Sequence, residues 1–435
     1  MALFRSDTGV VTMGVEAVAF GTVSANLARW HQCKALPDRG NLKQVYHPSD
    51  RVRSGNHQEQ GVLGHRSDST VSVEAFVRGY KDAAPTLFPT LSSPLLSGAT
   101  DEWPGIVALA HALGQIHVSG GGAAFGTVQA GTTAAAIVVL DKTLYAEGQP
   151  ICIDVSAAPH TIPIWETRRI KKIEAATHTL TLEFAFSAIP VNAQVVYAGI
   201  TIFPTQQPQI DSLSMTIQGE DNDGGVDWQH LLVGMCATAL GMKWDARGFI
   251  EMNMDCDVET WSRTDAGAAP LYTADTGPER QPLIGAKFDY SIAGGAPATM
   301  DAAAMEFDAG LSMLRPLSCI APQGVLRSKY GICQPVITVD PYKEAEATWM
   351  TAAAPFRAPS QVSCVFQGGD APGSIVALCV SNGNITDEPV LGDRDGLLVN
   401  PLQITPMVYV GDGVSGTDER NLTTPVGAPW CISFI

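Results

Sequence analysis

Residues 249–261 read FIEMNMDCDVETW, in which apolar and polar side chains alternate from Ile250 to Glu259. Because successive side chains of a β-strand point to opposite faces, this pattern predicts a strand with one oily and one acidic face. Each buried apolar side chain stabilises the fold by about 1.5–3 kcal/mol, whereas a one-residue register slip would bury carboxylates instead. We therefore expect the polar face to meet water. Its members are Glu251, Asn253, Asp255, Asp257 and Glu259.

The composition indicates a mainly β protein with a large core. Of the 435 residues, 45% are hydrophobic and 16% are charged, and 42 glycines and 28 prolines mark many turns. This mixture is typical of a folded, β-rich chain, and the length favours one elaborated domain with an insertion, or two domains.

The net charge of −17 argues against tight binding of nucleic acid. Proteins that hold DNA or RNA use lysine and arginine to displace condensed counterions from the phosphates. A protein that DNA only passes can instead benefit from an acidic surface, because such a surface repels DNA over about 8 Å at physiological salt. Simple solubility is the alternative explanation of the charge.

Nine cysteines occur without a C-x-x-C pair, and several lie inside apolar runs. They are typical of small buried hydrophobic residues. Their odd number, with no recognisable secretion signal, leads us to expect a reducing compartment. No segment reaches the roughly 18 apolar residues of a transmembrane helix, so we expect no membrane partner.

A polar stretch at about residues 29–66 predicts a long extended arm. An unstructured stretch of this length is unusual in a compact fold, which favours packing on a neighbouring subunit over a mobile surface loop. Its positive charges include Lys34, Arg39, Lys43, Arg51 and Arg53.

Two further patterns frame the core. Residues 70–80 alternate like residues 249–261 and predict a second amphipathic strand. Residues 101–115 change to a helical period, with Pro104 in the first turn and an apolar stripe ending at Leu113, and predict a helix. His111 and His117 flank its end, but no third metal ligand is in view, which favours structural roles for both.

Residues 137–204 contain short apolar segments separated by turns, including a predicted strand at 195–203, and predict an inserted small β-barrel. We accordingly divide the chain into a first domain part at 1–136, the insertion at 137–204, and a second part at 205–435 with a C-terminal β extension. In the last part, residues 231–244 and 249–261 predict a hairpin. Residues 285–293 alternate again, with Lys287, Asp289 and Ser291 on the polar side, and residues 407–410 are a further candidate strand.

No nucleophile elbow, phosphate loop, dinucleotide fingerprint or zinc-protease spacing occurs, so we expect neither an enzyme nor a cofactor. The acidic pairs Asp221/Asp223 and Asp393/Asp395 lack the glutamate that completes a calcium loop. The enzyme alternative is a glycoside hydrolase that uses paired carboxylates on the acidic strand, with Trp244 and Trp261 as sugar platforms.

The order of elements resembles the tail tube proteins of tailed bacteriophages. The resemblance lies in a strand ending at Gln218 and Gly219, a loop, residues 231–244 with Gly234 and Gly241, a turn, and residues 249–261. With the strand near Thr70, the helix near Asp101 and, less closely, residues 393–396, it covers about half of the chain.

The resemblance implies a tail-tube-type β-sandwich with one flanking α-helix and a long extended arm. It implies a structural virion protein, assembled in the bacterial host cytoplasm, whose stacked homo-oligomeric rings form the tail tube for DNA ejection. Its partners would be further copies of itself, the tape measure, terminator and baseplate proteins, and DNA in transit. The acidic strand would line the lumen, and the arm would contact the neighbouring ring.

Size is the departure, because the insertion and the long C-terminal region exceed a minimal tube subunit. If the region after Trp261 repeats the tube fold, three chains would supply the six sheets of a ring, and the ring would be a trimer. We expect a hexameric ring, because a second helix like 101–115 is not evident in that region. A baseplate or distal tail ring protein is the alternative within the same class.

Overall fold

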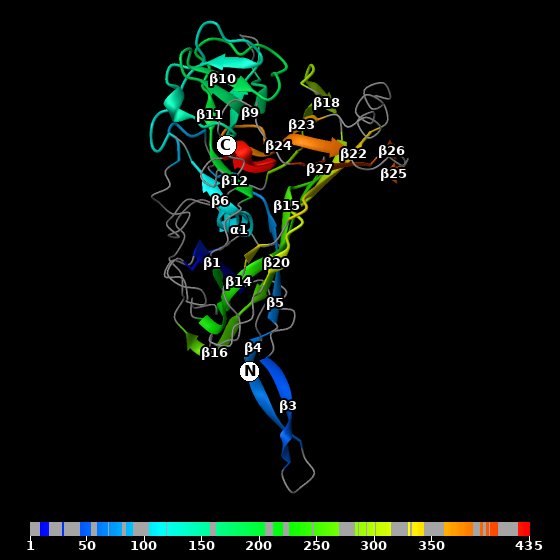
Figure 1. Ribbon diagram of the computed structural model, residues 1–435. Coiled ribbons are helices and arrows are strands. Elements are labelled where there is room, and N and C mark those ends of the chain that lie inside the picture. The colour runs from blue at the N-terminus through cyan, green and yellow to red at the C-terminus, as the bar shows by residue number, and fades with distance from the viewer. Residues whose placement is uncertain are drawn as a thin grey trace.

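The computed structural model describes residues 9–16, 28–29, 44–53, 59–67, 69–80, 84–89, 104–118, 120–156, 162–204, 212–220, 226–245, 248–268, 283–285, 287–292, 294–300, 302–314, 329–330, 333–342, 361–385, 392–394, 397–399, 401–407 and 425–435. Within these residues the protein is mainly β, with antiparallel sheets and one α-helix. Figure 1 shows an elongated molecule with a small sheet at one end, a body in the middle and a projecting hairpin at the other end.

One strand, β14 (Val226–Asp245), runs the length of the body and pairs with different strands along its two halves. Its first half lies between β13 and β16. Its second half lies between β15 and β19. The sheet around the first half has the order β2 (Ala28–Arg29), β1 (Gly9–Val15), β13 (Leu213–Glu220), β14 and β16 (Thr260–Ala268).

The second half of β14 belongs to a long sheet that curves around the core. Its order is β5 (Ser69–Phe76), β15 (Glu251–Val258), β14, β19 (Ala302–Asp308), β22 (Val336–Pro341), β27 (Leu402–Pro406), β24 (Val376–Ile385), β28 (Trp430–Phe434), β12 (Ile200–Pro204) and β6 (Gly114–His117). From β24 a branch continues through β23 (Val362–Gly368), β17 (Lys287–Ile292) and β18 (Ala298–Met300). Two short hairpins complete this region: β20 (Met313–Leu314) with β21 (Lys329–Tyr330), and β25 (Gly392–Arg394) with β26 (Leu397–Val399).

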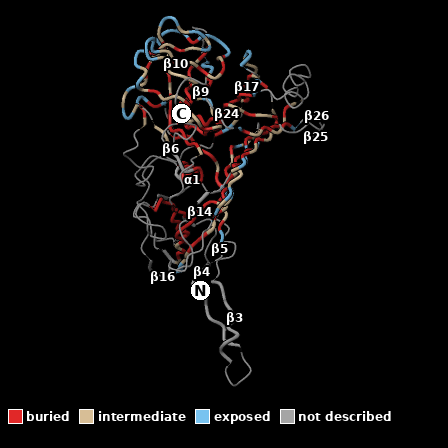
Figure 2. The backbone as a smooth tube through the Cα atoms, in the orientation of Figure 1, coloured by how far each residue is buried: buried red, intermediate tan, exposed pale blue. Residues whose placement is uncertain are grey.

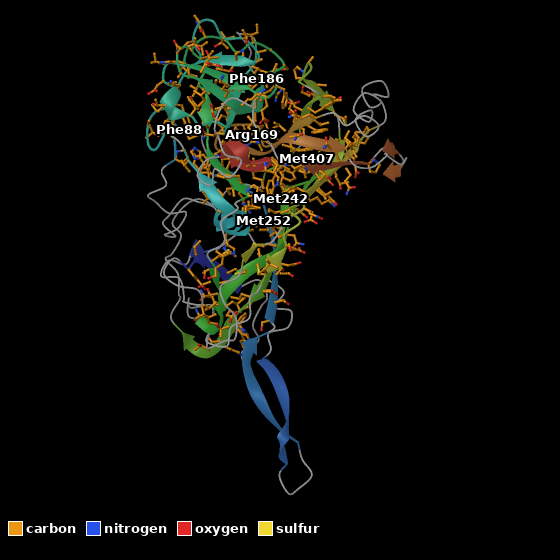
Figure 3. All side chains as sticks on the ribbon, in the orientation of Figure 1. Phe88, Arg169, Phe186, Met242, Met252 and Met407 are labelled. Carbon is orange, nitrogen blue, oxygen red and sulfur yellow. The ribbon has the colours of Figure 1, made fainter. Side chains whose placement is uncertain are left out.

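The predicted helix is present as α1 (Pro104–Leu113) and fills the centre of the body, but Gly114 and Gln115, at the end of the predicted range, belong to β6 instead. Ile106, Leu109 and Leu113 are buried there, as the apolar stripe predicts, and His111 is buried with them. The helix packs against β1, β6, β12 and β14, so strands face it on several sides. The oily faces of β5, β14 and β15 join it in one continuous core, in which Met242 and Met252 occupy paired positions of β14 and β15 (Figure 3).

The inserted residues form a separate five-stranded sheet with a core of its own. Its order is β11 (Tyr197–Ala198), β8 (Pro150–Asp154), β9 (Trp165–Glu174), β10 (Thr179–Leu182) and β7 (Ala136–Val138). Residues 126–129 bond to β7 at one end of this order and to the segment that leads into β11 at the other: Gln129 N donates to Val138 O at 2.8 Å, and Val128 N donates to Gln194 O at 2.8 Å. A 3-10 turn, η2 (Lys142–Leu144), lies between β7 and β8. Figure 2 shows buried backbone inside this region and exposed loops around it.

The strand predicted at 195–203 is in fact divided between two sheets. Its first part is β11 of the small sheet, whereas its second part is β12, which pairs with β28 and β6 of the long sheet. Gly199 separates the two parts. A continuous apolar run therefore carries the chain from the insertion back into the body, and its periodicity alone does not show where the sheet changes.

The predicted arm contains a hairpin of β3 (Gln44–Arg53) and β4 (Glu59–Ser67), which projects from the body (Figure 1). Arg51 and Arg53 lie in β3, whereas Lys34, Arg39 and Lys43 lie outside the described residues. The candidate strand at 407–410 is not supported at Met407, which follows the end of β27, and its other residues lie outside the described part.

Candidate functional site: an acidic sheet face

The alternation of residues 251–258 corresponds to one buried and one more exposed face. Met252, Met254, Cys256 and Val258 of β15 are each at most 1% exposed. Between them, Asn253 is exposed, and the three acidic positions Glu251, Asp255 and Asp257 are partly exposed. The polar face of this strand therefore has access to solvent in the isolated chain.

The neighbouring strands extend this polar face on both sides. Directly paired residues of antiparallel strands point to the same side, and the register pairs Asp255 with Ser72 of β5 and Glu251 with Lys243 of β14. The face then continues through β19 and β22, where Lys243 pairs with Glu306. We call this surface the acidic face; its charged members are Glu74, Lys243, Asp245, Glu251, Asp255, Asp257, Glu306, Asp308 and Asp340.

Negative charge dominates the acidic face. Among its described residues, Lys243 is the one basic side chain, against eight carboxylates. Lys243 Nζ lies 3.2 Å from Glu306 Oε1, but the side chains are 46% and 62% exposed, so this ion pair contributes little to stability. Ser72 Oγ donates to Asp255 Oδ1 at 2.5 Å, which fixes one carboxylate against β5. The excess of carboxylates over basic side chains on this face favours a role that requires negative charge there.

Glu259 does not share the solvent access of this face. Glu259 is 3% exposed and lies at the bend between β15 and β16. Val258 and Glu259 are both buried, so the alternation ends at this bend. The expectation that Glu259 meets water was therefore wrong, because a strict period of two holds only while the strand stays regular.

Four acidic members of the face were not predicted from sequence to lie on it: Asp245, Glu306, Asp308 and Asp340. Glu306 and Asp308 do alternate with buried Met305 and Phe307 over β19. That signal is short, and only the sheet order shows that it continues the surface of β15.

The hairpin is connected directly to the edge of this surface. β4 ends at Ser67 and β5 begins at Ser69, so the same run of chain leaves the hairpin and enters the sheet. Among the described strands, β5 pairs with β15 alone. The predicted arm and the predicted acidic strand, which are far apart in sequence, thus belong to neighbouring strands.

The features expected of a glycosidase site are weak here. Trp244, a candidate sugar platform, is fully buried, and Trp261 is partly buried against the core. Across the described ranges, no group of three or more His, Cys, Asp or Glu side chains is placed to hold a metal ion. Of the acidic turn residues, Asp221, Asp223 and Asp395 lie outside those ranges, and Asp393 lies in β25.

The sequence matches no protein-family description and no curated protein. In the part of the chain that the structure describes, no helix has the length and hydropathy required to cross a bilayer.

Proposed function

We propose that this chain is a structural subunit of a phage tail tube, in which the acidic face lines the channel through which DNA passes. The observation that carries the proposal is the acidic face itself. It presents eight carboxylates and one lysine on five adjacent strands, and the opposite side of the same strands belongs to the core.

A channel lining explains why such a surface is both acidic and regular. Double-stranded DNA carries one negative charge per about 1.7 Å of its axis, so cationic walls would hold it through counterion release. An acidic wall instead repels DNA over about 8 Å at physiological salt, which is a suitable range inside a narrow channel. A regular antiparallel sheet also continues readily from one subunit to the next, and ring closure would cover the edge at β5.

The finer architecture belongs to the same proposal. We infer a tail-tube-type sandwich in which the strands around α1 form the tube wall. We infer also that the inserted small sheet closes as a barrel, because residues 126–129 bond to β7 at one end of it and to the segment that leads into β11 at the other. The projecting β3–β4 hairpin would contact the next ring, and its arginines Arg51 and Arg53 suit acidic surface there.

In this proposal the protein occupies the virion tail and assembles with itself and with the tape measure, terminator and baseplate proteins. Rings of six chains are the expected assembly, and rings of three remain the alternative. No catalytic step is assigned to the chain, and DNA is a transient passenger.

The test is negative-stain electron microscopy of the purified full chain. Hollow filaments with a regular axial repeat support the proposal, and their end views give the ring number. Single closed rings that never stack would indicate a baseplate or distal tail ring protein instead. Monomers at concentrations of tens of micromolar, with turnover of glycan substrates, would overturn the structural role.

A further inference from the structure

Two consecutive arginines of β9, Arg168 and Arg169, are buried to 1% and 0% exposure. Neighbouring residues of a strand point to opposite sides, so burial of both means that β9 is covered on both sides. Charged side chains are almost never fully buried unless they are paired. Their partners therefore show how the small sheet is held against the body.

Arg168 connects the small sheet to β17. Its Nη1 donates to Asp289 Oδ2 at 2.8 Å, and its Nη2 donates to Glu166 Oε2 at 2.9 Å. Lys287 Nζ closes the network by donating to Glu166 Oε1 at 2.9 Å. The guanidinium also lies 4.6 Å from the ring centroid of Phe184.

Arg169 connects the small sheet to a segment more than 200 residues away. Its Nη1 donates to Ala428 O at 2.9 Å and to the Ser381 hydroxyl, and its Nη2 donates to Pro425 O. Its Nε donates to Gly148 O at 2.8 Å, within its own sheet. Three of these four hydrogen bonds are thus to groups outside the insertion, whereas Glu183, whose Oε1 lies 3.7 Å from Nη1, is within it. Figure 3 labels Arg169.

The distant segment, residues 425–435, consists of the 3-10 turn η5 (Pro425–Gly427), β28 and Ile435. We call it the strap. It pairs with β24 of the body on one side and with β12, the strand that leaves the insertion, on the other. Ile435 packs with Cys152 of β8 and Ile375. At Gly199 the approach is so close that a Cβ would lie 1.6 Å from Phe434 O.

We propose that the strap is a latch: the small sheet docks on the body only when residues 425–435 are paired, and the two come apart together. Without the strap, docking would bury Arg169 while removing two of its carbonyl acceptors, a strongly unfavourable arrangement. When the strap opens, the guanidinium returns to water only if the small sheet moves away. Docking and strap pairing are therefore one cooperative step.

The latch also sets an order of events in folding. Pro425 lies 256 residues from Arg169 in sequence, so the body strands between them are synthesised before the latch can close. The small sheet has its own core and can fold first, but it stays undocked until then.

Three native cysteines report the three relevant parts of the full-length chain. Cys152 lies between the small sheet and the strap, Cys431 lies in the strap, and Cys256 lies in β15; each is at most 1% exposed. Thiol alkylation under native conditions, read by mass spectrometry, measures how often each site opens. We expect Arg169→Met to accelerate labelling of Cys152 and Cys431 equally, by about tenfold or more, with Cys256 unchanged.

The matched control is Lys172→Met on the same strand, where the side chain is 33% exposed and pairs with Glu174. It should leave all three rates unchanged. If Arg169→Met does not fold, the wild-type chain at low urea gives the same test, because Cys152 and Cys431 should keep equal rates throughout. Opening of Cys431 while Cys152 stays protected, or equal acceleration of all three thiols, would overturn the latch. The assay uses unassembled chain, so its result is independent of tube formation.

Discussion

If the acidic face lines a channel for DNA as proposed, reversing three of its charges should make the channel retain DNA. The eight carboxylates and Lys243 give the face a net charge of −8 + 1 = −7 per chain. Replacing Glu251, Asp255 and Asp257 by lysine changes this by +6, to −1. Folding should survive, because all three residues are partly exposed and loss of the Ser72 hydrogen bond costs about 1 kcal/mol.

The assay is co-sedimentation of assembled protein with short double-stranded DNA over a series of salt concentrations. Each lysine that contacts a phosphate adds about 0.9 to the slope of log affinity against log salt, so the variant should gain a slope of about 3 per contacted chain. DNA inside a channel should also resist added nuclease. The wild type should show neither binding nor protection.

The control carries the same change in total charge away from the face, as Asp141→Lys, Glu174→Lys and Asp370→Lys. If this control retained and protected DNA as strongly as the face variant, position would not matter and the channel assignment would fail. The same conclusion would follow if face-variant filaments left DNA free and open to nuclease.

Four further outcomes are expected. Replacing residues 44–67 by a short Gly-Ser linker should leave a folded chain, by circular dichroism, that no longer forms filaments; normal filaments would remove the β3–β4 hairpin from assembly. Trp244→Ala empties a fully buried site and should lower the free energy of unfolding by about 3–5 kcal/mol in urea titrations, unlike an exposed Phe249→Ala control. Gly199→Ala should force β12 away from β28 and lower the melting temperature of the chain. Gly241→Ala, whose Cβ would lie 3.6 Å from Phe307 O, should leave the melting temperature unchanged. Burial acts to raise the pKa of Glu166, but Arg168 and the Ser187 hydrogen bonds outweigh it and leave that pKa below its usual value. The ionised Glu166 therefore stabilises the fold fully above the unfolded-state pKa of about 4.5, and this stabilisation is lost as the pH falls through the lower pKa of the folded state. Glu166→Gln should abolish this loss when unfolding is measured as a function of pH.

The elements with strong local periodicity could be predicted from sequence. The faces of residues 70–77 and 251–258 and the helix near 104–113 follow from side-chain alternation or a helical repeat, and each has the expected buried side. Such patterns indicate only which face of a single strand or helix is buried. They contain no information on which strands lie next to each other, so the extent of the acidic face was not predictable.

Asp289 is a residue whose burial the local pattern did not predict. It alternates with apolar neighbours and was expected on a polar face, yet it is 3% exposed, because Arg168 reaches it from a strand 121 residues away. The burial of Arg168 and Arg169 was not predicted from sequence, because adjacent arginines in a strand are ordinarily solvated. Only tertiary pairing makes them buried anchors.

The run from β4 into β5 has a mechanical consequence. Tension applied to the hairpin along its length passes straight into β5, which is held to β15 by a register of pairs from Ser69 with Val258 to Phe76 with Glu251. Because the load acts parallel to the strands, these rungs resist together in shear and are not unzipped one after another. A filament joined through such hairpins would stretch little before its subunits unfold.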